Sequence, residues 1–182
     1  MKGVEIKINP CSKDSFEILA LFLSEGIKSN ELFEILDEIK SQDGIIALPH
    51  PFDPFKGNPK EIRKILERVD AVEVFNSRVP ASVYNRKALS FAKKHGLGMI
   101  GGSDAHTERE VGNAYTVANV NDLEGLRKAI IKRETGVEGK LTSHLSRVAP
   151  SIGRFFGKGS LDKKFKSFCQ KIVEKTWSSK RR

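Results

Sequence analysis

The sequence has little cysteine and no long hydrophobic run. Its 182 residues contain two cysteines, Cys11 and Cys169, which lie far apart and outside any Cys-x-x-Cys pattern. This argues against a disulfide framework and against a zinc ribbon. No apolar run approaches the roughly 20 residues of a membrane span, and the N-terminus has no signal-peptide pattern. These absences predict a soluble protein in a reducing compartment, with the cytoplasm as the default.

Positive charge is plentiful but unevenly distributed. The formal net charge is +9, and residues 140–182 hold 12 of the 32 basic residues but only 2 of the 23 acidic ones. Residues 134–142 contain few core-forming side chains and are interpreted as a linker. We therefore predict two domains, 1–139 and 140–182, the second being a basic helical extension. Its aromatic and basic side chains allow two interpretations: contact with a nucleic-acid backbone, or packing of an apolar stripe with a solvated basic face.

Strands and helices are expected to alternate through the first domain. Short apolar or alternating runs indicate strands, and amphipathic runs between capping residues indicate helices. The expected strands are 4–8, 16–23, 45–48, 71–75, 97–100 and 114–120, and the expected helices are about 30–42, 59–69, 80–95 and 122–133. This rhythm is typical of βα units, so we predict an α/β fold with a mainly parallel sheet or barrel.

The segment Gly101–Thr107 is the strongest candidate for chemistry. It follows an apolar run, and its two glycines permit a sharp turn at the end of the strand. The turn then presents Asp104 and His106, a carboxylate and an imidazole that can each bind a divalent metal. The structural alternative is a surface turn in which the aspartate caps a helix and the histidine is incidental.

Other polar residues are expected at the ends of neighbouring strands. Glu5, His50 in a Pro-His-Pro turn, and Asn76 lie at such positions, where parallel strands of an α/β fold converge. Imidazole and carboxylate together suit zinc, manganese or iron better than calcium. Each residue also has a structural interpretation: a solvent-facing charge for Glu5, a rigid turn for His50 and an Asx turn for Asn76. Glu73, between buried valines, is interpreted as a structural partner.

Several motifs, taken together in this order, resemble the PHP (polymerase and histidinol phosphatase) family of metal-dependent phosphoesterases. They cover about residues 3–118. The matching segments are Gly3–Ile6, Glu17–Leu21, Ile46–Asp53, Val72–Arg78 and Gly101–Thr107 continuing to Thr116. The resemblance implies a distorted (β/α)7 TIM-like barrel that holds two or three divalent ions, with manganese, zinc and iron as the candidates.

The resemblance also implies a set of metal ligands. Glu5 is expected to bridge two metals, His50 and His106 to supply imidazoles, and Asp104 to supply a carboxylate. Glu17 stands where the family often has a histidine, and it is carried as a further carboxylate ligand.

The resemblance further implies the chemistry and the substrate contacts. Asp104 and His106 are the expected catalytic residues, while Arg78 and Asn76 are expected to bind substrate, the first through its planar guanidinium. The implied function is hydrolysis of a phosphomonoester or phosphodiester, such as a nucleotide or short oligonucleotide, by a metal-activated water. The alternative is a non-catalytic PHP remnant or an RNA-binding protein that acts through the basic extension.

One departure from the family pattern is clear. The N-terminal His-x-His motif is missing, since the sequence has four histidines and none precedes His50. The expectation is therefore a barrel that is incomplete at its N-terminus, with fewer metal ions and an open sheet edge. A separate upstream polypeptide that completes the barrel is one expected partner.

Overall fold

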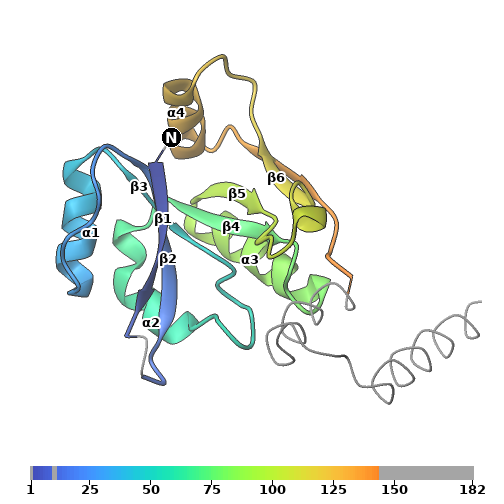
Figure 1. Cartoon of the computed structure of the whole chain (residues 1–182), viewed down its shortest axis with the longest axis horizontal. Helices are drawn as coiled ribbons and strands as arrows, with labels where there is room; N and C mark the ends of the chain where they lie inside the picture. Colours follow the sequence, from blue (N-terminus) through green and yellow to red (C-terminus); the bar gives the residue numbers. More distant parts are fainter. Residues whose placement is uncertain (1, 10–11, 144–182) are drawn as a thin grey trace, which may run out of the picture. The chain divides into compact units, whose positions relative to one another are not determined.

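The computed structural model describes residues 2–9 and 12–143, in which strands and helices alternate (Figure 1). The strands are β1 (Lys2–Ile8), β2 (Phe16–Leu23), β3 (Ile45–Leu48), β4 (Ala71–Asn76), β5 (Gly98–Gly102), β6 (Ala114–Val117) and β7 (Gly136–Gly139). The helices are α1 (Leu32–Ser41), α2 (Pro59–Ile65), α3 (Ser82–His95) and α4 (Leu123–Lys132), with short 3-10 turns at Leu66–Arg68 and Glu108–Glu110. The predicted α/β class is confirmed.

The main sheet is mixed and not mainly parallel as predicted. Its five strands lie in the order β1-β2-β3-β4-β5, and β3, β4 and β5 are parallel. The β1–β2 and β2–β3 pairs are antiparallel. The short connection between β1 and β2 explains the first pair, because a parallel pair needs a crossover of a dozen or more residues.

The expectation of a (β/α)7 barrel needs a correction. Within residues 2–9 and 12–143 the sheet is not closed: β6 pairs with β7 in a separate two-stranded sheet, and β1 and β5 form the two edges of the main sheet. The N-terminal hairpin is the physical reason at one edge, since β1 turns back on β2 and its outer side is left without a strand partner in the part of the chain that is described.

The two faces of the main sheet are packed differently. Helices α1, α2 and α3 bury the larger core on one face, with Ile18, Ile46, Leu48 and Val72 among the most buried strand residues. The opposite face carries a smaller cluster, to which α4 contributes. It includes Leu19, Leu21, Ile45, Ala47, Ala71, Ile100 and Ile130. Because side chains alternate along a strand, Glu5 and Glu17 lie on this second face.

The proposed linker over residues 134–142 is partly a strand. Strand β7 pairs with β6, and a side chain at Gly139 would overlap Ala114. Thr142 is buried and its backbone N–H donates to the carbonyl oxygen of Ser77 at 2.7 Å. The interpretation as a linker was wrong because glycine-rich sequence also suits a close strand pair.

The predicted helices of the extension lie outside the described residues, and the domain boundary and the RNA contact stay predictions. Among the described residues, no helix is long and apolar enough to cross a membrane.

Candidate metal centre

The candidate centre lies where the three parallel strands end. His50 follows β3, Asn76 closes β4 and Asp104 follows β5, so the shared strand direction brings them to one edge of the sheet. Strand β2 runs antiparallel to β3, with Leu19 opposite Ala47, so its first residues reach the same edge. This places Glu17 beside His50.

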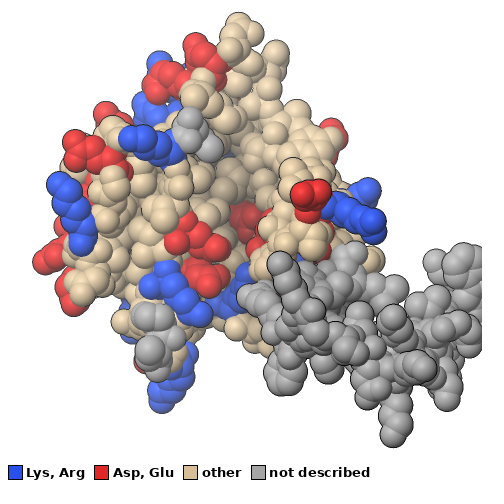
Figure 2. All heavy atoms as spheres, viewed as in Figure 1, with Lys and Arg blue, Asp and Glu red and all other residues tan. Residues whose placement is uncertain are grey.

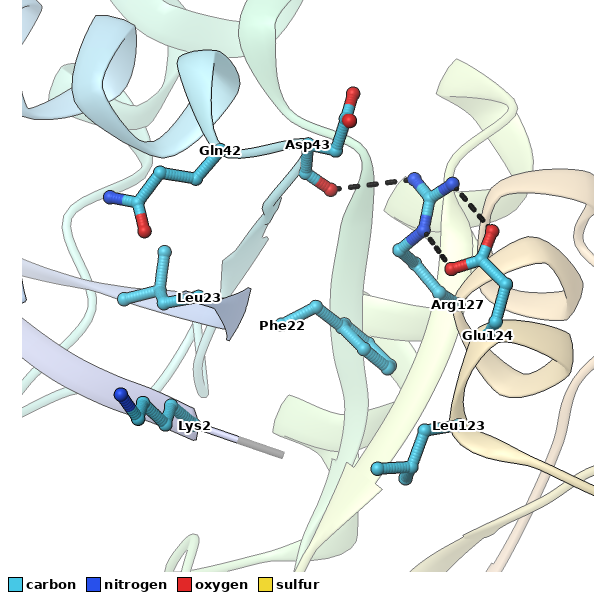
Figure 3. Close-up of a pocket in the computed structure, with 8 residues that line it drawn as sticks. All are labelled: Lys2, Phe22, Leu23, Gln42, Asp43, Leu123, Glu124 and Arg127. Atoms are coloured by element: carbon cyan, nitrogen blue, oxygen red, sulfur yellow. Dashed lines mark hydrogen bonds and ion pairs between the residues drawn. The ribbon is translucent and has the colours of Figure 1, made fainter. Parts of the chain in front are cut away.

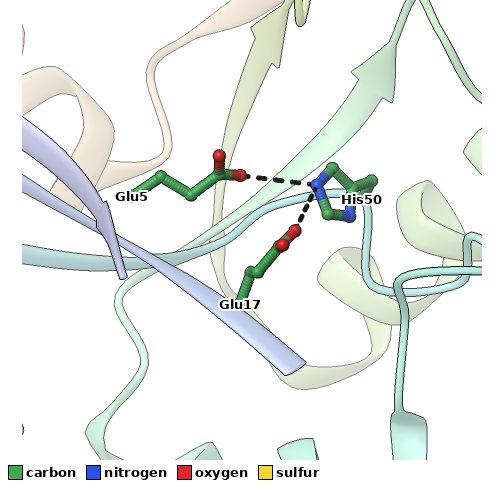
Figure 4. A group of neighbouring side chains, drawn as sticks. All are labelled: Glu5, Glu17 and His50. Carbon is green, nitrogen blue, oxygen red and sulfur yellow. Dashed lines mark ion pairs between the residues drawn. The ribbon is translucent and has the colours of Figure 1, made fainter. Parts of the chain in front are cut away.

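Glu5, Glu17 and His50 form the core of the centre (Figure 4). The His50 Nε2 atom lies 3.2 Å from Glu17 Oε2 and 3.5 Å from Glu5 Oε1. One ligand atom from each of the three residues lies within 4.8 Å of the other two. The side chains of His50 and Glu17 are 3% and 15% exposed, whereas that of Glu5 is 47% exposed. The group is therefore buried on one side and open on the other.

The buried atoms of this group are not satisfied by hydrogen bonds. Glu17 Oε2 and His50 Nε2 are buried and lie 3.2 Å apart as an ion pair, but neither they nor His50 Nδ1 form a well-aligned hydrogen bond. Such atoms are costly unless something else binds them. Two carboxylates around an imidazole are a ligand set typical of zinc, manganese or iron. The three residues therefore fit a divalent metal ion.

The electrostatics of the group also favour a cation. Burial disfavours the charged form of His50, but the adjacent Glu17 and Glu5 carboxylates outweigh this and raise the His50 pKa to about 9. Contact with His50 lowers the pKa of Glu17, although burial opposes the shift. The carboxylates thus attract positive charge to the position between them.

Glu73 fixes the turn that carries His50. Its buried carboxylate accepts a hydrogen bond from the His50 backbone N–H at 2.8 Å and one from Asn76 Nδ2 at 3.0 Å. Burial raises the Glu73 pKa to about 7. His50 has a φ of 29°, a conformation that needs such support in a residue other than glycine. The interpretation of Glu73 as a structural partner is confirmed.

Asn76 also behaves as its structural interpretation predicts. Its Oδ1 atom accepts from the backbone N–H of Arg78 at 2.7 Å, which is an Asx turn. Its Nδ2 group points to Glu73 and, at 3.5 Å, to Asp104 Oδ2. Asn76 is 1% exposed, so it links the two carboxylates inside the protein. Its predicted substrate contact stays a prediction.

Asp104 and His106 lie beside the three-residue group and not within it. Asp104 Oδ2 is 3.1 Å from Lys56 Nζ, and Asp104 has a φ of 47°. His106 Nδ1 is 2.8 Å from the Asp104 carbonyl oxygen, and its side chain is 39% exposed. The sequence predicted five metal ligands, and the structure brings three of them together in a group of metal-binding size.

Arg78 is engaged in a salt bridge. Its guanidinium lies 2.7 Å from Glu110 Oε2, and Glu110 also accepts from the His106 backbone N–H at 2.7 Å. Glu110 is 1% exposed. Burial raises its pKa, but the hydrogen bond from His106 and the pairing with Arg78 outweigh this and lower it. The predicted contact of Arg78 with substrate stays a prediction, since its observed partner is inside the protein.

Sequence reasoning missed Lys56 and Glu110. Lys56 is one of 32 basic residues, and nothing in its spacing distinguishes it. Glu110 lies 32 residues from Arg78, and their pairing follows from the fold. The only sequence signal near either residue is their closeness to the motifs that contain His50 and His106.

A pocket lies at the end of the sheet opposite the candidate centre (Figure 3). It has a volume of about 310 Å³ and is lined by Lys2, Phe22, Leu23, Gln42, Asp43, Leu123, Glu124 and Arg127. Leu21 pairs with Ile45 at the start of β3, whereas His50 follows the end of that strand. The pocket is therefore separate from the candidate centre.

Comparison with known sequences gives two matches. A family model described as PHP-associated matches residues 83–135, a segment that contains Asp104 and His106. The chain is also 46% identical over 120 residues to the uncharacterized protein MJ0417 of Methanocaldococcus jannaschii. That alignment covers 62% of this chain and 48% of the other protein, so the chain spans about half the length of this curated relative.

Two solved structures share the fold. One is a two-domain protein from Bacteroides vulgatus described as containing a predicted PHP-like metal-dependent phosphoesterase, with a TM-score of 0.60 and 22% identity. The match covers 83% of this chain and 48% of that one. The other is PsfC from Pseudomonas syringae, with a TM-score of 0.55 and 18% identity, covering 85% of this chain and 64% of that one.

The fold and the candidate centre define an α/β protein with a cluster of side chains suited to a divalent metal. The match to a PHP-associated family model bears out the PHP resemblance for residues 83–135, and the two solved structures share the fold.

Proposed function

We propose that this chain contributes the active site of a metal-dependent phosphoesterase, in which Glu5, Glu17 and His50 hold a divalent ion. The observation that carries the proposal is the convergence of one ligand atom each from Glu5, Glu17 and His50 within 4.8 Å, with the buried Glu17 Oε2 and His50 Nε2 making no well-aligned hydrogen bond. The PHP-like phosphoesterase described for the B. vulgatus protein supports the reaction class. Manganese, zinc and iron are the proposed metals, because all three accept this mixed ligand set.

Different residues of the chain would then bind the metal, position its ligands and move protons. When bound, a divalent ion makes a coordinated water acidic and polarises a phosphoryl oxygen. Glu73 holds the backbone of His50 so that its imidazole faces Glu17. Asp104 lies at the border of the centre, where Asn76 links it to Glu73. We propose Asp104 as a further carboxylate ligand.

His106 is suited to moving a proton. Its Nδ1 atom is 2.8 Å from the Asp104 carbonyl oxygen, which can only accept a hydrogen bond. The Nδ1 atom therefore carries the proton, and Nε2 remains to exchange a proton with an oxygen of the substrate. The 39% exposure of the side chain gives a substrate access to it.

The substrate proposals are a phosphomonoester or a phosphodiester, with a nucleotide or short oligonucleotide first. We also propose the barrel that the PHP resemblance implies. Strand β1 is an edge of the sheet to which further strands, from an upstream polypeptide, can add.

The first test is metal content. Protein purified without a histidine tag is reconstituted with manganese, zinc or iron, and plasma mass spectrometry measures the bound ions. We expect about one ion or more per chain in the parent and a loss of most of it in Glu17→Gln. Glu25→Gln, at a carboxylate whose side chain is 74% exposed, is the matched control. A parent that stays metal-free after reconstitution would contradict the proposal.

The second test is hydrolysis of p-nitrophenyl phosphate and bis(p-nitrophenyl) phosphate, which separates the two ester classes. Activity that survives in Glu17→Gln and resists a chelator would also contradict the assignment, since it would come from another site or a contaminant.

A further inference from the structure

Lys56 places a positive charge beside the carboxylates of the candidate centre. Its ammonium lies 3.1 Å from Asp104 Oδ2. Burial disfavours the charged ammonium, but the carboxylates of Asp104, Glu17 and Glu5 outweigh this and raise the Lys56 pKa. Figure 2 shows acidic side chains gathered in the hollow of this face, with basic side chains next to them. The Lys56 ammonium is therefore a positively charged group of the protein itself, next to the carboxylates that surround the proposed metal position.

The loop that carries Lys56 has a defined conformation. Asp53 donates its backbone N–H to the His50 carbonyl oxygen at 2.9 Å, and its own carbonyl accepts from Gly57 at 2.8 Å. The Asp53 carboxylate also accepts from the Lys56 backbone N–H at 3.2 Å. A side chain at Gly57 would overlap the Pro51 carbonyl, so this tight turn requires glycine. The loop thus fixes the backbone of Lys56 relative to His50.

Lys56 is better placed than Arg78 to meet a ligand. The Lys56 side chain is 37% exposed, whereas that of Arg78 is 13% exposed and paired with the buried Glu110. A lysine side chain is long and flexible, and its ammonium binds phosphate oxygens as a point charge. Moving the ammonium away from Asp104 toward solvent requires only rotations within the side chain.

We propose that Lys56 binds the phosphate group of the substrate and that in the metal-free protein the same ammonium is held by Asp104. This inference rests on the proposed function. A divalent ion at Glu5, Glu17 and His50 repels the ammonium and competes with it for the carboxylates. An incoming phosphate supplies a new negative partner at the same place. Lys56 thus weakens metal binding and strengthens phosphate binding.

The two roles predict opposite effects of one substitution. Lys56→Met keeps most of the length of the side chain and removes the charge. We expect Mn²⁺ to bind the variant roughly tenfold more tightly than the parent, because a repelling charge is gone. We expect inorganic phosphate to bind the Mn²⁺-loaded variant roughly tenfold more weakly, because a charged hydrogen bond is lost. A residue that only supports the loop would not shift the two affinities in opposite directions.

Isothermal titration calorimetry on the full chain tests this, with Mn²⁺ added to chelator-stripped protein and phosphate added afterwards to the loaded protein. Lys60→Met is the control, since Lys60 is exposed on the neighbouring helix α2. Lys56→Arg keeps the charge and should retain most of the phosphate affinity. Circular dichroism establishes that each variant is folded.

The outcomes separate the two proposals. Mn²⁺ binding by the parent, with equal Mn²⁺ or equal phosphate affinities in parent and Lys56→Met, would overturn the role of Lys56 and leave the proposed function standing. A parent that binds no metal would contradict the proposed function and, with it, this inference. Opposite shifts in Lys56→Met, absent in Lys60→Met, would support it.

Discussion

The two ends of the main sheet contain similar charged residues, but these residues differ in burial and in hydrogen bonding. At the pocket end, Arg127 donates to both oxygens of Glu124 and to the Asp43 carbonyl (Figure 3). Lys2 donates to the Ser24 carbonyl. At the other end, Glu17 and His50 keep buried polar atoms that make no well-aligned hydrogen bond. Charge alone therefore does not mark a site. A site is indicated instead by ligand atoms that are buried, lie close together and make no well-aligned hydrogen bond, because such an arrangement costs folding free energy.

We expect replacement of His50 to have the strongest effect on metal binding. His50→Ala removes the imidazole at the centre of the three-residue group and leaves two carboxylates near each other. We expect Mn²⁺ affinity to fall at least about 100-fold and hydrolysis to fall with it, since loss of even a supporting partner costs up to that much. Calorimetry and a chromogenic phosphodiester measure the two effects. Unchanged metal affinity would remove His50 from the ligand set.

The next effect tests the support behind His50. Glu73→Gln keeps the size of the side chain, and its carbonyl oxygen can accept the two hydrogen bonds that Glu73 Oε2 accepts, but the negative charge is lost. We expect a loss of roughly tenfold in Mn²⁺ affinity. Glu61→Gln is the matched control, because Glu61 is also buried but pairs with Lys64 on α2. Equal affinities in the two variants would make Glu73 a purely structural residue.

The sequence predicted the strands of this fold better than their partners. Periodicity located the segments that became β1 to β6 within a few residues, because it reports which side chains are buried locally. Periodicity alone does not give strand direction. The short connection between β1 and β2 does imply an antiparallel pair, which the expectation of a mainly parallel sheet did not include. Strand β7 was interpreted as a linker because its glycines carry no hydrophobic pattern.

The candidate site was predictable where a general rule applies. Strand ends converge in α/β folds, and this rule, together with the PHP motifs, pointed to His50, Asp104 and Glu17. It could not find Lys56, whose position comes from the hydrogen bonds of Asp53 and the tight turn at Gly57. It also could not foresee that Glu110 would pair with Arg78. These contacts join side chains whose distances depend on the complete fold.

Removal of the metal should destabilise the parent but not a variant whose three-residue group cannot bind the ion. If the ion binds the folded protein and not the unfolded chain, saturation at about 100 times Kd adds about 2.7 kcal/mol to the free energy of unfolding. We therefore expect a chelator to lower the thermal midpoint of the parent and to leave that of Glu17→Gln unchanged. Thermal unfolding followed by circular dichroism measures both. An equal drop in the two proteins would mean that the ion stabilises them from elsewhere.

We expect the smallest effect at the pocket end of the sheet. Arg127→Met removes a guanidinium whose partners are an exposed glutamate and a backbone carbonyl, so little buried polar surface loses its partner. Exposed ion pairs contribute little to stability, and we expect the thermal midpoint to fall by less than about 4 °C. Mn²⁺ and phosphate affinities should equal those of the parent, because β3 separates this pocket from His50. A change in either affinity would show that the two ends are coupled through the strands that connect them.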